Sequence, residues 1–117
     1  MIVNGKAVLG YNENLVSLGL LERINNDLYL RNCKNLKDLG KLKVINGYLN
    51  LRECISLESL GEVESISGYL RLEQCHKLKD LGNLRYVKYS IFLYGSAITK
   101  NYVRKEKPFL LDNCNWD

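Results

Sequence analysis

The sequence has little of the material from which most catalytic sites are built. It contains one histidine, His76, and no GxxxxGK[ST], GxGxxG or HExxH motif, which argues against a phosphate-binding loop or a zinc-protease site. A Cys–His nucleophile pair is also disfavoured, because His76 directly follows an inward-facing residue, Cys75, and should point outward. We therefore expect no enzymatic activity, no catalytic residue and no cofactor.

Proline and long apolar runs are equally scarce. Pro108 is the single proline, and there is no Gly/Ser-rich linker, so residues 1–117 are expected to form one domain. No apolar run reaches the roughly 18 residues of a membrane span, and the first residues lack the apolar stretch of a signal peptide. We expect a cytoplasmic protein with no membrane association, whose cysteines are reduced.

What the sequence does contain is leucine at a fixed spacing of 21 residues. Leu51 has equivalents at Leu9, Leu30, Leu72 and Leu93, and Gly61 has equivalents at Gly19, Gly40 and Gly82. A period of this length is typical of a solenoid, in which each coil stacks on the one before it. The spacing covers residues 3–99, and residues 100–117 leave it, so we expect these last residues to form a C-terminal cap.

Within each coil, two apolar positions separated by one residue predict a strand with one buried face. The expected strands lie near 6–9, 27–31, 48–52, 69–73 and 90–94, and all of them belong to one parallel sheet. A second recurring position holds Gly5, Asn26, Gly47 and Gly68 but Tyr89 in the last coil. Glycine and asparagine adopt left-handed backbone conformations at low cost, so this position predicts a turn.

Three of the four cysteines also recur at this spacing, namely Cys33, Cys54 and Cys75. Zinc sites and disulfides need cysteines that converge from different segments, whereas these occupy equivalent points of successive coils. We therefore expect no metal. The chain leaves the strand at this point, so the thiols are expected to hydrogen-bond to buried backbone groups that have no strand partner.

The stretch Leu-Asn-Leu-Arg-Glu-Cys-Ile-Ser-Leu, residues 49–57, matches the pattern LxLxx(N/C)xxL. It resembles leucine-rich repeats, especially those of receptor L domains and of short cytosolic leucine-rich proteins of bacteriophage and bacteria. The expected fold is mainly β, a right-handed leucine-rich-repeat solenoid of about five coils with one parallel sheet, little α-helix and a C-terminal cap. The resemblance also implies a phage-encoded binder or inhibitor of a host or antiviral-defence protein.

The residues that alternate with the buried leucines should form the outer face of the sheet and bind another protein. They are Tyr29, Arg31, Tyr48, Asn50, Arg52, Tyr69, Arg71, Glu73, Phe92 and Tyr94. Tyrosine and arginine are enriched in binding hot spots, although aromatic residues also stabilise strands by stacking. The alternative is a protein that binds single-stranded nucleic acid, against which stand Asp27 and Glu73 on the same face.

The first expected strand, at residues 6–9, has a neighbour on one side only. An exposed strand edge can pair with another chain. We therefore expect either a monomer or a weak homo-oligomer that associates through this sheet edge.

Overall fold

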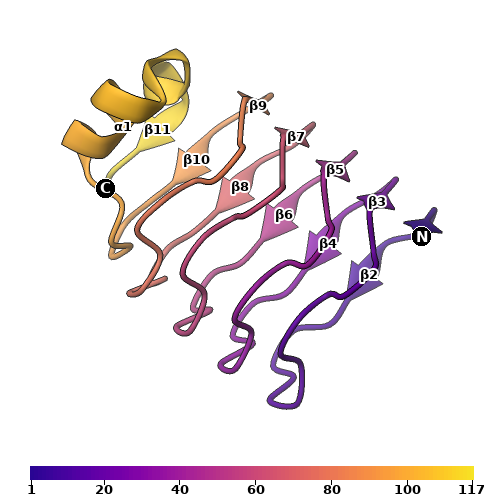
Figure 1. Ribbon diagram of the computed structural model, residues 1–117. Coiled ribbons are helices and arrows are strands. Elements are labelled where there is room, and N and C mark those ends of the chain that lie inside the picture. The colour runs from indigo at the N-terminus through magenta and orange to yellow at the C-terminus, as the bar shows by residue number, and fades with distance from the viewer.

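A computed structural model describes all residues, 1–117, and contains two parallel sheets and, near the C-terminus, two short helices (Figure 1). The five-stranded sheet contains β1 (Ile2–Val3), β3 (Arg23–Ile24), β5 (Val44–Ile45), β7 (Ser65–Ile66) and β9 (Tyr86–Val87), in that order. The six-stranded sheet has the order β11-β10-β8-β6-β4-β2. Its strands are β2 (Ala7–Val8), β4 (Leu28–Tyr29), β6 (Leu49–Asn50), β8 (Leu70–Arg71), β10 (Ile91–Phe92) and β11 (Cys114–Asn115).

The expectation of a mainly β chain with parallel pairing and little helix is confirmed, but the expectation of one sheet is wrong. The second sheet is formed by positions such as Ile24, Ile45 and Ile66, whose β-branched side chains are buried in strands of two residues each. In both sheets paired residues are 21 positions apart, as in Ile24↔Ile45 and Leu28↔Leu49. The strands are also shorter than expected, since β4 covers only Leu28–Tyr29 of the expected 27–31.

The glycines that precede β6 and β8, Gly47 and Gly68, are required for a different reason from the one expected. Gly47 and Gly68 do not have positive φ. A Cβ atom on Gly68 would lie 2.5 Å from Tyr48 Cδ1 and 2.8 Å from the carbonyl carbon of Gly47. Glycine is therefore needed here because neighbouring turns of the chain approach closely, and the left-handed residues lie elsewhere, for example at Glu53 (φ 64°).

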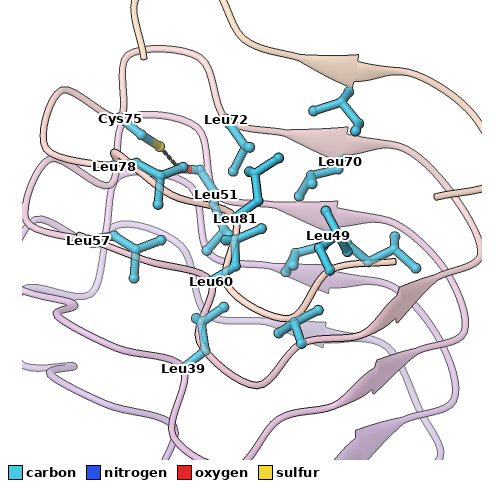
Figure 2. Close-up of a cluster of buried hydrophobic side chains, with 14 of the residues drawn as sticks. Leu39, Leu49, Leu51, Leu57, Leu60, Leu70, Leu72, Cys75, Leu78 and Leu81 are labelled. Atoms are coloured by element: carbon cyan, nitrogen blue, oxygen red, sulfur yellow. Dashed lines mark hydrogen bonds between the residues drawn. The ribbon is translucent and has the colours of Figure 1, made fainter. Parts of the chain in front are cut away.

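The core is a single column of apolar side chains that runs between the two sheets (Figure 2). It contains 27 buried residues, and no polar or charged residue is buried. Leu49 on β6 and Leu51 just after it meet leucines from the opposite side of each turn, such as Leu57 and Leu60. Burial of this kind provides most of the driving force for folding.

The two ends of the column differ. At the C-terminal end, α1 (Lys100–Glu106) buries Val103, η1 (Pro108–Asn113) buries Leu110, and β11 pairs with β10. The side-chain amide of Asn113 also donates to the carbonyl oxygens of Val87 and Tyr89, at 2.8 Å in each case. Neither helix has the length and apolar character needed to cross a membrane.

At the N-terminal end, β1 and β2 are edge strands with one neighbour each. Apolar side chains of this first turn are exposed, including Ile2, Val8, Val16 and Leu20. Residues 21 positions later are charged at three of these sites, namely Arg23, Lys37 and Lys41. The first turn therefore exposes apolar side chains where the next turn exposes charged ones.

Candidate functional site

The outer face of the six-stranded sheet carries a hollow of about 280 Å³, which we call the tyrosine hollow. Tyr29 on β4, Asn50 on β6 and Arg71 on β8 point outward because each is the strand residue next to a buried leucine. The complete lining is Tyr29, Tyr48, Leu49, Asn50, Tyr69 and Arg71. Five of these six were expected on this face from the sequence.

Tyr69 is the centre of an aromatic cluster that borders the hollow. Its ring centroid lies 5.2 Å from that of Tyr48, 5.4 Å from Tyr89 and 5.9 Å from Phe92, with tilted geometry in each pair. The Arg71 guanidinium lies 4.4 Å from the centroid of the Phe92 ring. Tilted aromatic pairs and cation–π contacts hold rings in fixed positions, so one wall of the hollow is preorganised.

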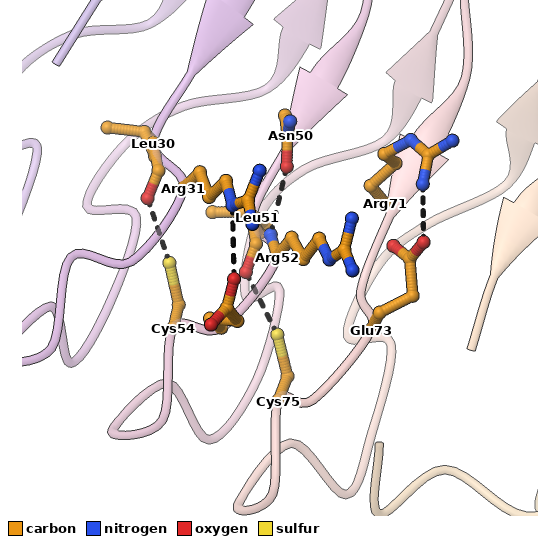
Figure 3. Close-up of polar contacts among 10 residues, drawn as sticks. Leu30, Arg31, Asn50, Leu51, Arg52, Cys54, Arg71, Glu73 and Cys75 are labelled. Carbon is orange, nitrogen blue, oxygen red and sulfur yellow. Dashed lines mark hydrogen bonds and ion pairs between the residues drawn. The ribbon is translucent and has the colours of Figure 1, made fainter. Parts of the chain in front are cut away.

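Beside the hollow lies a second group of side chains, Arg31, Arg52, Glu53, Arg71 and Glu73, which we call the charged row (Figure 3). Arg31 Nε lies 3.0 Å from Glu53 Oε1, and Arg71 Nη1 contacts Glu73 Oε2. Arg52 forms no ion pair, and its Nε is buried without a hydrogen-bond partner. The Oε1 atom of Glu73 is buried without a partner as well.

Tyr29 and Asn50 present polar groups at the hollow. The Tyr29 hydroxyl donates to Asp27 Oδ2 at 3.3 Å. Burial, and then the negative charge of Asp27, raise the pKa of Tyr29, so its hydroxyl stays protonated at neutral pH. Asn50 Oδ1 accepts from the backbone N–H of Arg52 at 3.0 Å, which fixes the orientation of the Asn50 amide.

The structure therefore separates the ten expected site residues into groups. Tyr29, Tyr48, Asn50, Tyr69 and Arg71 line the hollow, Phe92 packs on Tyr69, and Arg31, Arg52 and Glu73 belong to the charged row. Tyr94 is 58% exposed and forms none of the aromatic pairs.

Sequence reasoning missed three contributors to this surface. Leu49 was assigned to the core and also lines the hollow, and Glu53 neutralises Arg31. Tyr89 packs on Tyr69, although the residue 21 positions before Tyr89 is a glycine, Gly68. The break from glycine to tyrosine in the 21-residue spacing was the available signal for Tyr89.

The cysteine thiols point away from this face and into the core. Cys33, Cys54 and Cys75 donate to the carbonyl oxygens of Leu9, Leu30 and Leu51, at 3.3, 3.1 and 3.0 Å. The expected hydrogen bonds of this cysteine position to buried backbone groups are thus confirmed. Burial raises the pKa of Cys54 and of Cys75 to about 12, so neither is a thiolate nucleophile near neutral pH.

The one histidine lies outside the core. His76 is exposed, and its Nε2 lies 2.8 Å from Gln74 Oε1, whereas Cys75 before it is fully buried. The two side chains therefore point in opposite directions. No group of three or more His, Cys, Asp and Glu side chains is arranged to hold a metal ion.

No protein-family model, curated protein or solved structure matches this chain. The tyrosine hollow and the charged row adjoin each other, because Arg71 on β8 belongs to both.

Proposed function

We propose that the chain is a right-handed leucine-rich-repeat solenoid that acts as a non-catalytic protein-binding module through the outer face of its six-stranded sheet. The observation that carries the proposal is the tyrosine hollow, a concave site on an otherwise regular sheet surface. The resemblance of residues 49–57 to leucine-rich repeats of phage and bacterial proteins adds a host or antiviral-defence protein as the partner, located with it in the cytoplasm.

The solenoid part of the proposal is supported by the register of both sheets. Every strand from β1 to β10 pairs with strands 21 positions away. The cysteine thiols repeat their hydrogen bond at the same interval. A stack of equivalent coils explains both facts, since each coil then contacts only its neighbours.

The binding part is supported by the chemistry of the hollow. Tyrosine contributes a large contact area with few rotatable bonds, so little conformational entropy is lost when it is buried. Tyr48 and Tyr69 are 40% and 39% exposed, which leaves much of each ring available to a partner. The tyrosine rings supply apolar contact, while Asn50 and Arg71 supply directional hydrogen bonds.

The non-catalytic part is supported by the lack of an activated nucleophile or base at the hollow. Its polar groups are tyrosine hydroxyls, one amide and one guanidinium. The thiols of Cys54 and Cys75 are buried, and burial raises the pKa of each to about 12, so both stay protonated near neutral pH.

Single-stranded nucleic acid remains the second candidate, because Tyr48, Tyr69 and Phe92 could stack on bases. The carboxylates disfavour it. Asp27, Glu53 and Glu73 lie among the cations of this face, and two of the three arginines are already paired. A titration with a mixed oligonucleotide at low salt tests it, and a mobility shift at micromolar protein would favour it over a protein partner.

Site-specific photocrosslinking tests the proposed function. A photoreactive amino acid at Asn50, in the hollow, should give a discrete crosslink to one protein in cells that express the chain. The same amino acid at Ser65, half-buried on β7 of the other sheet, is the matched control. Equal crosslinking from both positions would contradict the assignment of the binding face.

A further inference from the structure

The charged row holds one more cation than its carboxylates neutralise. It contains three arginines and two glutamates, and Glu53 and Glu73 pair with Arg31 and Arg71. The Arg52 side chain forms neither an ion pair nor a hydrogen bond, and only its backbone N–H donates, to Asn50 Oδ1. Arg52 is therefore the one arginine of the row that is free to receive an anion.

The surroundings of Arg52 favour an anion more strongly than an ordinary surface site would. Its Nε is buried, so the guanidinium has lost part of its hydration without gaining a hydrogen bond. An anion that binds the terminal Nη groups gives the guanidinium a charge-assisted hydrogen bond, which compensates for this loss. The packed side chain also loses little conformational freedom on binding.

Arg52 is adjacent to the tyrosine hollow. It follows Asn50, a lining residue, by two positions, and Figure 3 shows its side chain between Arg31 and the Arg71–Glu73 pair. Arg71 in turn lines the hollow. A single extended segment can therefore reach both the hollow and the free guanidinium, because two residues of extended chain span about 6.6 Å.

We propose that the partner segment carries one aspartate or glutamate within about two residues of a bulky apolar side chain. The apolar side chain occupies the tyrosine hollow, and the carboxylate binds Arg52. This inference rests on the proposed protein-binding function and specifies its ligand. One free guanidinium suits one carboxylate, whereas a run of phosphates would also meet the carboxylates of Glu53 and Glu73 in the same row.

Random-peptide display tests the inference with three baits: the full chain, Arg52→Gln and Tyr69→Ala, each first shown to unfold cooperatively. Peptides selected on the unmodified chain should share an acidic residue close to an aromatic or branched aliphatic one. Selection on Arg52→Gln should keep the apolar residue and lose the acidic one. For one selected peptide, replacing its acidic residue by the amide should weaken binding about tenfold on the chain and hardly at all on Arg52→Gln.

The outcomes separate the two proposals. Selected peptides without an acidic preference, or with one that survives Arg52→Gln, would overturn the inference and leave the binding face intact. Peptides that bind Tyr69→Ala as well as the unmodified chain, or a failure to select any, would contradict the proposed function itself. Tighter binding of an oligonucleotide such as a thymidine 12-mer than of any selected peptide would point to nucleic acid.

Discussion

The thiol of Cys75 donates a hydrogen bond to the carbonyl oxygen of Leu51, 24 residues earlier, with Sγ and O 3.0 Å apart. Both residues are fully buried, and the bond links two neighbouring turns of the chain (Figure 2). Replacing Cys75 by alanine leaves this carbonyl without its thiol donor and removes a buried sulfur atom. We expect the free energy of unfolding to fall by about 1–3 kcal/mol.

Cys114→Ala is the matched control for this measurement by urea titration. Cys114 is only half-buried, and its thiol lies 3.4 Å from Leu110 O within the same C-terminal segment. We expect a smaller loss for it than for Cys75→Ala. Equal losses would show that the link between turns contributes nothing special.

The thiols of Cys54 and Cys75 should make the free energy of unfolding depend on pH in the alkaline range. The pKa of Cys54 and of Cys75 is about 12 in the folded chain, against 9.0 for a thiol without burial. Above pH 9 the unfolded chain loses these protons and the folded chain keeps them, so stability falls as pH rises from 9 toward 12. By pH 10 the loss should reach about 1.4 kcal/mol per thiol.

Urea titrations at pH 7 and pH 10 measure this effect. The double substitution Cys54→Ala and Cys75→Ala should reduce the pH dependence of the free energy of unfolding. The tyrosines are the same in the parent chain and in the double variant, so the difference between the two reports the thiols. An unchanged difference between pH 7 and pH 10 in the double variant would contradict the assignment to the thiols.

Two glycines at equivalent positions should respond differently to alanine. At Gly68 the new methyl would meet Tyr48 and the backbone of Gly47 at 2.5–2.8 Å, so we expect a loss of about 1–3 kcal/mol. At Gly5 nothing lies within 4 Å, and φ is not positive. Gly5→Ala should therefore leave stability unchanged or raise it by about 0.4–1 kcal/mol. Thermal unfolding of both variants provides the comparison, and equal effects would contradict the close approach of neighbouring turns.

The exposed apolar residues of the first turn make self-association testable. Val16 and Leu20 are 48% and 72% exposed, and Lys37 and Lys41 occupy the equivalent positions one turn later. Val16→Lys with Leu20→Lys should change the free energy of unfolding by less than about 0.5 kcal/mol. If the chain associates weakly through the edge strands β1 and β2, light scattering should show less association in this variant. A parent chain that stays monomeric at every concentration would contradict association through this edge.

The sequence allowed the larger sheet to be predicted because Leu28 and Leu30, and their equivalents, alternate with polar residues. The smaller sheet was not predictable in the same way. Strands β3, β5, β7 and β9 bury one residue each, such as Ile45, and a single buried residue shows no alternation of apolar and polar positions. The role of Gly68 was misjudged because left-handed backbone and close approach both select glycine, and the sequence does not distinguish them.

For the candidate site, the sequence indicated which side chains share a face but not which of them pair. Arg31, Arg52 and Arg71 look equivalent in sequence. Only the arrangement of the side chains in the structure shows that Arg31 and Arg71 form ion pairs and that Arg52 does not. Tyr89 joined the aromatic cluster because its ring reaches Tyr69 from a position that glycine occupies in earlier turns. Such contacts depend on rotamers, which the 21-residue spacing does not determine.

The most direct test of the binding face is the affinity of the crosslinked partner for two alanine variants of the chain. Tyr69 lines the hollow and is 39% exposed, and Phe109, 59% exposed, is an even more exposed aromatic residue on η1 outside it. We predict that Tyr69→Ala weakens binding by at least about 30-fold, typical of a 2 kcal/mol hot spot, while Phe109→Ala changes it less than about twofold. Equal affinities of the two variants would contradict the claim that the tyrosine hollow binds the partner.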